Sequence, residues 1–452
     1  MAGGRRRRQR KRRRGRQPGA EASTLPLPSE PTALGNREVA IGERPFKKTC
    51  HKSGSTSSSL SGPHVWPDLL DCLLHQIISI FSSFQDLLAF SGTCRSWRAA
   101  LSSFPSAYTF TFPPLHLKPD IPNTRSSYNN FKYNLLSDCK WKLGDPSKRN
   151  LSRHCSAPRN TPNRMRYVGC SYGYLIFSYH ENCLLVNVYT GSKVELPKLQ
   201  SARNKQIYYG ILTAPLNSPN SHLLLCSGSS IIYWHVGTNS WSEHPFGGER
   251  ILQIVLLKGE MFVMDFLHRL HTIRFTPQLS MQEVPVVWGK EMVLGLHFKP
   301  WLVVCGDMLL MLDLSVGIDQ LHGYSGTFQV FRLDFSVRTA MWVKMQKLEN
   351  HALFVSLDRR NPTFSCMSPE RWGGKSNCIY VANPAEDSDE PWTTVELGKP
   401  VPTTTHCVAH RQIPRVTEPN GHCSQLESLW VLPSLIYGVD KIVFGFSRCV
   451  VF

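Results

Sequence analysis

Three stretches of this sequence carry residue types that could take part in chemistry. In the first, Gly169-Cys-Ser171-Tyr-Gly173 fits the pattern G-x-S-x-G, which in hydrolases presents a serine nucleophile at a turn from a strand into a helix. The residues that follow, Tyr174 to Tyr179, have the composition of a strand. We therefore expect a tight turn between two strands, and a hydrolase that uses Ser171 is an alternative hypothesis.

The second stretch, Gly373-Gly-Lys-Ser376, resembles the end of a phosphate-binding loop, but Pro369 occupies the position of its first glycine and no helical pattern follows. The third is a group of histidines and cysteines, whose members are His406, Cys407, His410, His422 and Cys423. A zinc ion could take Cys407 and His410 with one of the later pair, but two adjacent residues are awkward as ligands of one metal. We expect loop residues here, and in the whole chain no metal, no cofactor and no catalytic residue.

The charge of the chain is concentrated at one end. The formal net charge is +18, and residues 5 to 16 hold ten basic residues and no acid. Without them the net charge is +8 (18 minus 10), so the rest of the chain is only mildly basic. Nucleic-acid binding is therefore not the expected function, and an RNA-binding protein led by its basic tail is an alternative.

Residues 1–63 are rich in Arg, Ser, Pro and Gly and poor in large apolar residues, so we expect a disordered basic tail. Dense basic runs serve in nuclear import, and the expected nuclear localisation residues are Arg5, Arg6, Arg7, Arg8, Arg10, Lys11, Arg12, Arg13 and Arg14. The fourteen cysteines form no C-x-x-C pair, and no apolar segment follows the basic run as in a secretory signal. We expect reduced cysteines, no membrane span, and a location in the nucleus and/or cytoplasm.

Between residues 66 and 98, apolar residues recur at helical spacing. One face of a first helix is predicted by residues three or four positions apart, namely Leu70, Leu73, Leu74, Ile77 and Phe81. Two further short helices are predicted after the breaks at residues 82–83 and 92–93. Three short helices cannot bury all this apolar surface by themselves, so some of it should contact a partner.

The same stretch resembles an F-box. Three blocks of that motif are matched at the right spacing, by Leu73-Leu74-x-x-Ile77, Asp86-Leu87-Leu88 and Cys94-x-x-Trp97-Arg98. Two positions depart from the motif, because Leu69-Leu70 stands in place of Leu-Pro and Thr93 in place of a valine. The resemblance implies binding to the Skp-type adaptor of an SCF ubiquitin ligase. The residues expected on the adaptor face and in its supporting core are Leu69, Leu70, Leu73, Leu74, Ile77, Leu87, Leu88, Cys94 and Trp97.

From Arg166 onward, short apolar runs alternate with turn residues. Groups of short strands at intervals of tens of residues predict radially repeated sheets, which is the pattern of a β-propeller. At about 40–45 residues per blade, this length allows about six blades. A pair of β-sandwiches is the alternative architecture.

A second resemblance supports the propeller. The segments 169–175, 188–191 and 196–197, and later 342–345, 352–357 and 377–381, resemble plant F-box proteins whose C-terminal half is a KIB-type β-propeller (domain of unknown function 295). We therefore expect a multidomain chain. Its parts are a disordered basic tail (1–63), a small all-α F-box of three helices (64–104), a connector (105–163), an all-β KIB-type propeller (164–437) and a C-terminal segment (438–452).

The two resemblances together imply a non-catalytic subunit of an SCF-type (cullin-RING) E3 ubiquitin ligase. The F-box would bind the Skp-type adaptor and through it the cullin complex, and the propeller would bind an unidentified protein target. The alternative is a β-propeller scaffold with a degenerate F-box that does not join a ligase.

Overall fold

The computed structural model describes residues 69–103, 112–120, 139–148, 152–157, 161, 165–199, 205–247, 250–275, 278–289, 300–319, 323–337, 339–383, 390–402 and 426–433. The basic tail, the Cys/His group at residues 406–423 and the segment 438–452 lie outside these residues. Among the described helices, none is both long and apolar enough to cross a membrane.

Three short helices come first in the described part of the chain, as the spacing of apolar residues predicts. They are α1 (Asp71–Ser79), α2 (Phe84–Thr93) and α3 (Arg95–Ser103). The break between α1 and α2 contains Ser83, whose hydroxyl accepts a hydrogen bond from the backbone N–H of Asp86 at 3.2 Å. That bond satisfies one of the free N–H groups at the start of α2, so the serine that interrupts the helical pattern also begins the next helix.

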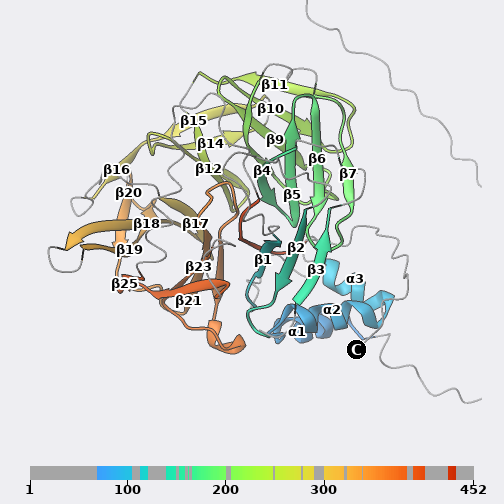
Figure 1. Cartoon of the computed structure of the whole chain (residues 1–452), viewed down its shortest axis with the longest axis horizontal. Coiled ribbons are helices and arrows are strands. Elements are labelled where there is room, and N and C mark those ends of the chain that lie inside the picture. Colours follow the sequence, from blue (N-terminus) through green and yellow to red (C-terminus); the bar gives the residue numbers. More distant parts are fainter. Residues whose placement is uncertain are drawn as a thin grey trace, which may run out of the picture. The chain divides into compact units, whose positions relative to one another are not determined.

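The rest of the described chain forms six sheets arranged around a common centre, which makes a six-bladed β-propeller (Figure 1). We number the blades in chain order and name the strands of each from the centre outward. The first contains β26 (Leu429–Val431), β1 (Leu115–Asp120), β2 (Lys140–Gly144) and β3 (Ser152–Ser156). The second contains β4 (Arg166–Ser171), β5 (Tyr174–Tyr179), β6 (Asn182–Asn187) and β7 (Lys193–Glu195). The third contains β8 (Ile207–Leu212), β9 (His222–Ser227), β10 (Ser230–His235) and β11 (Trp241–Pro245).

The remaining blades include two irregular ones. The fourth contains β12 (Ile251–Leu257), β13 (Glu260–Asp265), β14 (Leu270–Arg274) and β15 (Ser280–Val284). The fifth contains β17 (Trp301–Cys305), β18 (Met308–Asp319), β19 (Gly323–Asp334) and β20 (Ala340–Met345), with β16 (Val286–Trp288) parallel to β20 and β25 (Pro400–Val401) paired to β19. The sixth contains β22 (Phe364–Met367), β21 (His351–Ser356), β23 (Cys378–Ala382) and β24 (Trp392–Glu396). In it β21 and β23 run parallel, and a 3₁₀ helix, η3 (Pro369–Trp372), lies on the crossover between β22 and β23.

The first blade closes the ring. Its strand β26 comes from the C-terminal part of the chain and pairs antiparallel with β1, so that Leu115 lies opposite Val431 and Leu117 opposite Leu429. Its other three strands come from residues 115–156, inside the segment expected to be a connector. Those strands are short, and residues 121–138 between β1 and β2 are rich in turn formers, which explains why no repeat is visible there in the sequence.

Each pair of neighbouring blades is joined by a hydrogen bond between a side chain of one blade and a backbone group of the other. Tryptophan indoles make three of these bonds, Trp141 to the carbonyl of Val188 at 2.7 Å, Trp301 to that of Ser356 at 2.8 Å and Trp430 to that of Val355 at 3.1 Å. Buried polar side chains make the other three, in which Ser171 accepts from Leu212, Tyr209 accepts from Ile254, and Gln253 both donates to and accepts from Leu302. A buried polar group without a partner is unfavourable, so these bonds favour one arrangement of the blades.

Candidate functional site

Helix α1 carries two adjacent apolar stripes. The inner stripe consists of Leu74 and Ile78, which are buried against the rest of the protein. The outer stripe consists of Leu70, Leu73, Ile77 and Ile80, which recur every three or four residues and therefore lie along one side of the helix. Leu70, Leu73 and Ile80 are 67%, 41% and 66% exposed, and they are among the few large hydrophobic side chains that the described residues leave exposed. An exposed apolar stripe of this kind indicates a binding surface.

The nine residues predicted for the adaptor face separate into three groups. Leu74 and Leu87 are fully buried. Leu69, Ile77, Leu88, Cys94 and Trp97 are partly buried, and all but Cys94 pack at the edge of the hydrophobic core. Leu70 and Leu73 are exposed. This division could not be predicted from the sequence. Ile80 was also not predicted as part of the site, and it extends the outer stripe by about one helical turn beyond Ile77.

Side-chain contacts inside the helical module hold α1, α2 and α3 together. The ring of Trp97 on α3 lies 4.7 Å from that of Phe90 on α2, and Phe90 contacts Phe81 edge to face at 5.4 Å. The imidazole of His75 on α1 hydrogen-bonds the carbonyl of Ala100 on α3 at 3.0 Å. These contacts fix α1 against its two neighbours and keep the outer stripe in place.

Cys94 begins helix α3. Its backbone is extended, and its sulfur accepts a hydrogen bond from the N–H of Trp97 at 3.5 Å, while its carbonyl accepts one from Arg98 at 3.2 Å. Serine or aspartate usually occupies such a position. The Cys-x-x-Trp block is therefore explained by helix capping, with the tryptophan as the residue whose N–H is capped.

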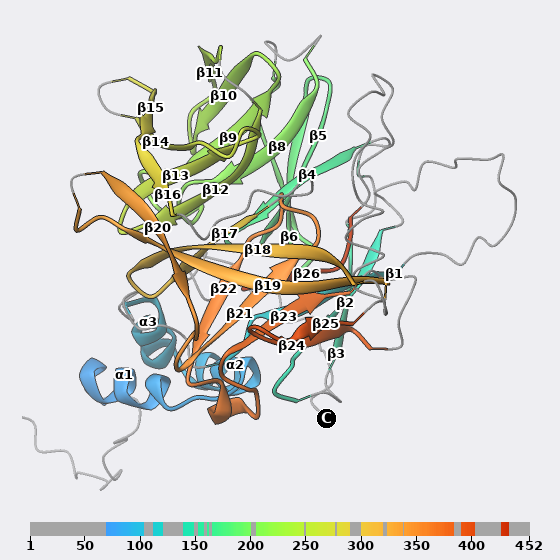
Figure 2. The ribbon, with the colours of Figure 1, turned by 90° about the vertical axis from the view of Figure 1, so that its left-hand side faces the viewer.

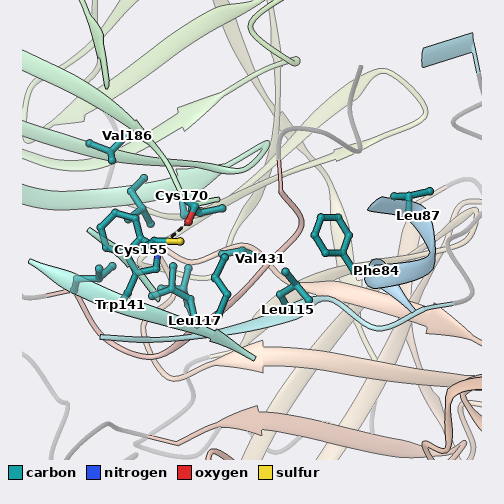
Figure 3. Packing of buried hydrophobic residues seen from close by; sticks show 14 of the residues in the cluster. Phe84, Leu87, Leu115, Leu117, Trp141, Cys155, Cys170, Val186 and Val431 are labelled. Atoms are coloured by element: carbon teal, nitrogen blue, oxygen red, sulfur yellow. Dashed lines mark hydrogen bonds between the residues drawn. The ribbon is translucent and has the colours of Figure 1, made fainter. Parts of the chain in front are cut away.

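The helical module is packed onto the first two blades of the propeller. Figure 3 shows Phe84 and Leu87 of α2 in the same hydrophobic cluster as Leu115, Trp141 and Val431. Phe84 also meets Tyr189, which follows β6, edge to face with ring centroids 5.7 Å apart. This continuous core joins the outer stripe on α1 to the propeller by side chains that are mostly buried.

A polar contact lies beside this hydrophobic seam. The carboxylate of Asp86 accepts from the hydroxyl of Ser83 at 2.7 Å and lies 3.3 Å from the ammonium of Lys148, which also contacts Gln85. Both charged groups are partly exposed, so the ion pair itself stabilises the protein little. Its geometry instead fixes the start of α2 against the loop between β2 and β3.

The motifs that could suggest catalysis have structural roles. Ser171 ends β4, and a tight turn through Tyr172 and Gly173, both with positive φ, leads directly into β5, which confirms the predicted strand–turn–strand arrangement. The hydroxyl of Ser171 is buried and bonded to the backbone of Leu212 at 2.7 Å. The backbone N–H of Lys375 donates to the hydroxyl of Tyr380 at 2.9 Å. The described residues contain no group of three His, Cys, Asp or Glu side chains placed to hold a metal ion.

Burial keeps the interior cysteines protonated. It raises the pKa of the Cys183 and Cys226 thiols to about 12 and that of Cys366 to about 11. A thiol reacts as its thiolate, so these cysteines are poor nucleophiles. The ten cysteines that the structure describes are all free.

A largely buried network of charged and polar side chains joins residues that lie far apart in the sequence, so the sequence alone did not predict it. The guanidinium of Arg360 donates to the carboxylate of Asp358 at 2.9 Å and to the carbonyl of Tyr167 at 2.7 Å, and the Tyr167 hydroxyl donates to Asn361. Burial by itself would raise the pKa of Asp358, but the charge and hydrogen bonds of Arg360 outweigh it and lower the pKa. Because Asp358 follows β21 in the sixth blade and Tyr167 lies on β4 in the second, the network fastens blades that are not neighbours.

The fold and the site together define a β-propeller with a three-helix module packed against it (Figure 2). The family whose sequence pattern is described as the KIB1-4 beta-propeller matches residues 143–407. The chain belongs to this family, which confirms the resemblance seen in the sequence.

Two curated relatives come from Arabidopsis thaliana. The F-box protein At2g26160 is 22% identical over 333 residues, which cover 70% of this chain and 95% of that protein. The putative F-box protein At3g25750 is 24% identical over 338 residues, which cover 70% of this chain and 87% of that protein. Among solved structures, the N-terminal domain of Nup159 overlaps 46% of this chain and 56% of its own, with 7% identity and a TM-score of 0.24.

Proposed function

We propose that this chain is the substrate-recognition subunit of an SCF-type cullin-RING ubiquitin ligase. The outer stripe of α1 binds the Skp-type adaptor, and the propeller holds a protein target. The single observation that carries the proposal is the exposed apolar stripe of Leu70, Leu73 and Ile80 beside a buried one, in a helical module with the blocks of an F-box. The names of the two Arabidopsis relatives support it.

The mechanism is one of positioning. The protein brings the target close to the ubiquitin carried by another subunit, which raises the effective concentration of the reacting groups. The buried seam between α2 and the first two blades suits this role, because it leaves little freedom between the adaptor surface and the propeller. In this proposal no residue of the chain makes or breaks a bond, and the basic run at residues 5–16 directs part of the protein to the nucleus.

The experiment is a binding assay of the full chain with purified Skp-type adaptor. Leu73→Asp combined with Ile77→Asp should reduce binding below detection, because the complex would bury two carboxylates in an apolar seam. Leu267→Asp combined with Val287→Asp is the matched control, since these exposed residues lie on the propeller and their replacement adds the same charge. Binding should survive in the control.

One observation favours a second candidate function. Leu70, which occupies the place of the proline in the motif, begins α1 without a side-chain cap, and Thr93 is exposed at the end of α2. Both departures fall on the helical module. If the unmodified chain fails to bind the adaptor, the protein is a propeller scaffold outside the ligase; if both double variants bind equally well, the outer stripe is not the adaptor surface.

A further inference from the structure

The first blade carries a row of basic side chains, three lysines and a histidine, that crosses three strands. In the antiparallel register, Lys118 on β1 lies opposite Lys142 on β2, and Lys142 lies opposite His154 on β3. Residues directly opposite each other in a sheet point to the same face. Lys140, two positions before Lys142, extends the same face with a further positive charge.

The basic side chains of this row are not held in ion pairs among the residues that the structure describes. Lys118, Lys140, Lys142 and His154 take part in none of the ion pairs found there. Asp120 is opposite Lys140 in the register, yet no ion pair joins them. Lys140, Lys142 and His154 are exposed, and Lys118 is half-buried.

The needs of the fold do not explain the row. Like charges directly opposite each other destabilise a sheet. Lysines often protect the outermost strand of a sheet from pairing with other chains, but Lys118 and Lys142 are on inner strands of this blade. Opposite charges at these positions would stabilise the sheet more. A role in binding a negatively charged ligand explains why lysines occupy them instead.

The rest of this face shows what kind of ligand fits. Trp141, Leu143 and Cys155 occupy the other face of the sheet and belong to the core that this blade shares with α2 and the second blade. Along β1, the row's own face continues with His116, two positions before Lys118, which is packed against Trp392 and Trp430; burial and nearby Lys118 lower its pKa to about 3, so it is neutral. On the outer side, β3 pairs only with β2 among the described strands, so its other edge can accept backbone hydrogen bonds.

We propose that this face of the first blade binds an extended acidic segment of a protein target. The segment lies along the free edge of β3 as an added strand, and its alternate side chains place carboxylates beside His154 and Lys142. Addition of a strand to a sheet edge gives affinity through main-chain hydrogen bonds and specificity through every second side chain. The inference rests on the proposed function only in naming the bound segment as part of the ligase target.

The test measures fluorescence anisotropy of a labelled peptide of alternating glutamate and threonine, which places all carboxylates on one face of a strand. The protein is the full chain, and every variant is also made without residues 5–16, because that basic run attracts any acidic peptide. Lys142→Glu should weaken binding by at least about tenfold in both backgrounds, because attraction is replaced by repulsion. A peptide of alternating glutamine and threonine should bind more weakly to the unchanged protein.

Measuring the thermal stability of the Lys142→Glu variant distinguishes a role of Lys142 in binding from a role in folding. Lys142→Glu places a carboxylate directly opposite Lys118, so the thermal midpoint should stay equal or rise while binding falls. The matched control is Lys347→Glu, which makes the same change of charge at an exposed site on the loop after β20. A loss of affinity no greater than in this control overturns the proposal.

Two further outcomes are decisive. Stronger binding of a single-stranded RNA that displaces the peptide would make the row a nucleic-acid surface and overturn the peptide proposal. If the adaptor binds through α1 but the acidic peptide does not bind, this inference fails and the proposed function stands. If the peptide binds and the adaptor does not, the proposed function fails and this surface stands.

Discussion

Asp265 shows how one buried carboxylate can organise a turn. Its side chain is completely buried, and it accepts hydrogen bonds from the backbone N–H groups of Leu267 and Arg269 and from the guanidinium of Arg269, all at 2.9 Å. His271 contacts it at 3.0 Å. Burial alone would raise the pKa of this carboxyl, but the hydrogen bonds from Arg269 and His271 outweigh it and the pKa is lowered. The turn between β13 and β14 therefore depends on an ionised Asp265.

This lowered pKa predicts a pH dependence of stability. A carboxyl whose pKa is lower in the folded state stabilises the protein above its unfolded pKa of about 3.9, and the contribution is lost as the pH falls through the folded value. Asp265→Asn should reduce the free energy of unfolding by about 1–3 kcal/mol at neutral pH. The difference between the two proteins should shrink below about pH 4, as urea unfolding at several pH values would measure.

The control for this residue is Asp307→Asn, because Asp307 is an exposed carboxylate whose partner Lys258 is also exposed. Its replacement should change the free energy of unfolding by no more than about 0.5 kcal/mol. A difference for Asp265→Asn that stays the same from neutral to acid pH would show that the charge of Asp265 is not what stabilises the turn.

At the scale of the element, the start of α3 depends on a thiol. Cys94→Ala removes the acceptor for the N–H of Trp97 and should reduce the free energy of unfolding by about 1 kcal/mol. Cys94→Ser keeps a capping oxygen and should retain most of the stability. Thermal unfolding of the two variants makes the comparison, and equal loss in both would mean that the sulfur acts by packing and not by capping.

The helical elements could be predicted from the sequence better than the blades. Leu74 and Ile77 lie at helical spacing within a motif, so the existence of α1 follows from local pattern. The strand β26 consists of three residues near the end of the described chain, and its partner β1 is some three hundred positions away. No local pattern encodes such a pairing, nor does one encode the parallel pairing of β21 with β23.

The candidate site was only partly predictable for the same reason. A helical period shows that Leu73 and Leu74 are neighbours on α1, but which of them faces the protein depends on what packs against the helix. Leu74 is buried in the core that also contains Phe84 and Trp141, and these residues meet only in the folded chain. Likewise Lys118, Lys142 and His154 form a row only through strand register.

At the scale of the whole molecule, the six blades fit around their centre because inner strands approach closely. A Cβ atom on Gly169 of β4 would lie 2.1 Å from the carbonyl oxygen of Gly210 on β8, so one of these strands would have to move. Gly169→Ala should therefore destabilise the protein by about 1–3 kcal/mol or more, as chemical denaturation would measure. Gly228→Ala is the control, because nothing lies within 4 Å of its added Cβ. Equal effects in the two variants would show that this approach is not a constraint on the ring.

The pairing of β26 with β1 also has a consequence for the newly made protein. During translation the ribosome produces β26 after every other described strand. The inner edge of β1 in the first blade therefore stays unpaired until residues 429–431 have emerged. Leu429 and Val431 of that strand belong to the same core as Phe84 and Leu87 of α2. The first blade, against which the helical module packs, is thus completed last. In a nascent chain that stalls before residue 429, the helices pack against a blade that lacks its innermost strand. The order of synthesis therefore makes the full packing of the helical module a property of chains that have been translated through β26.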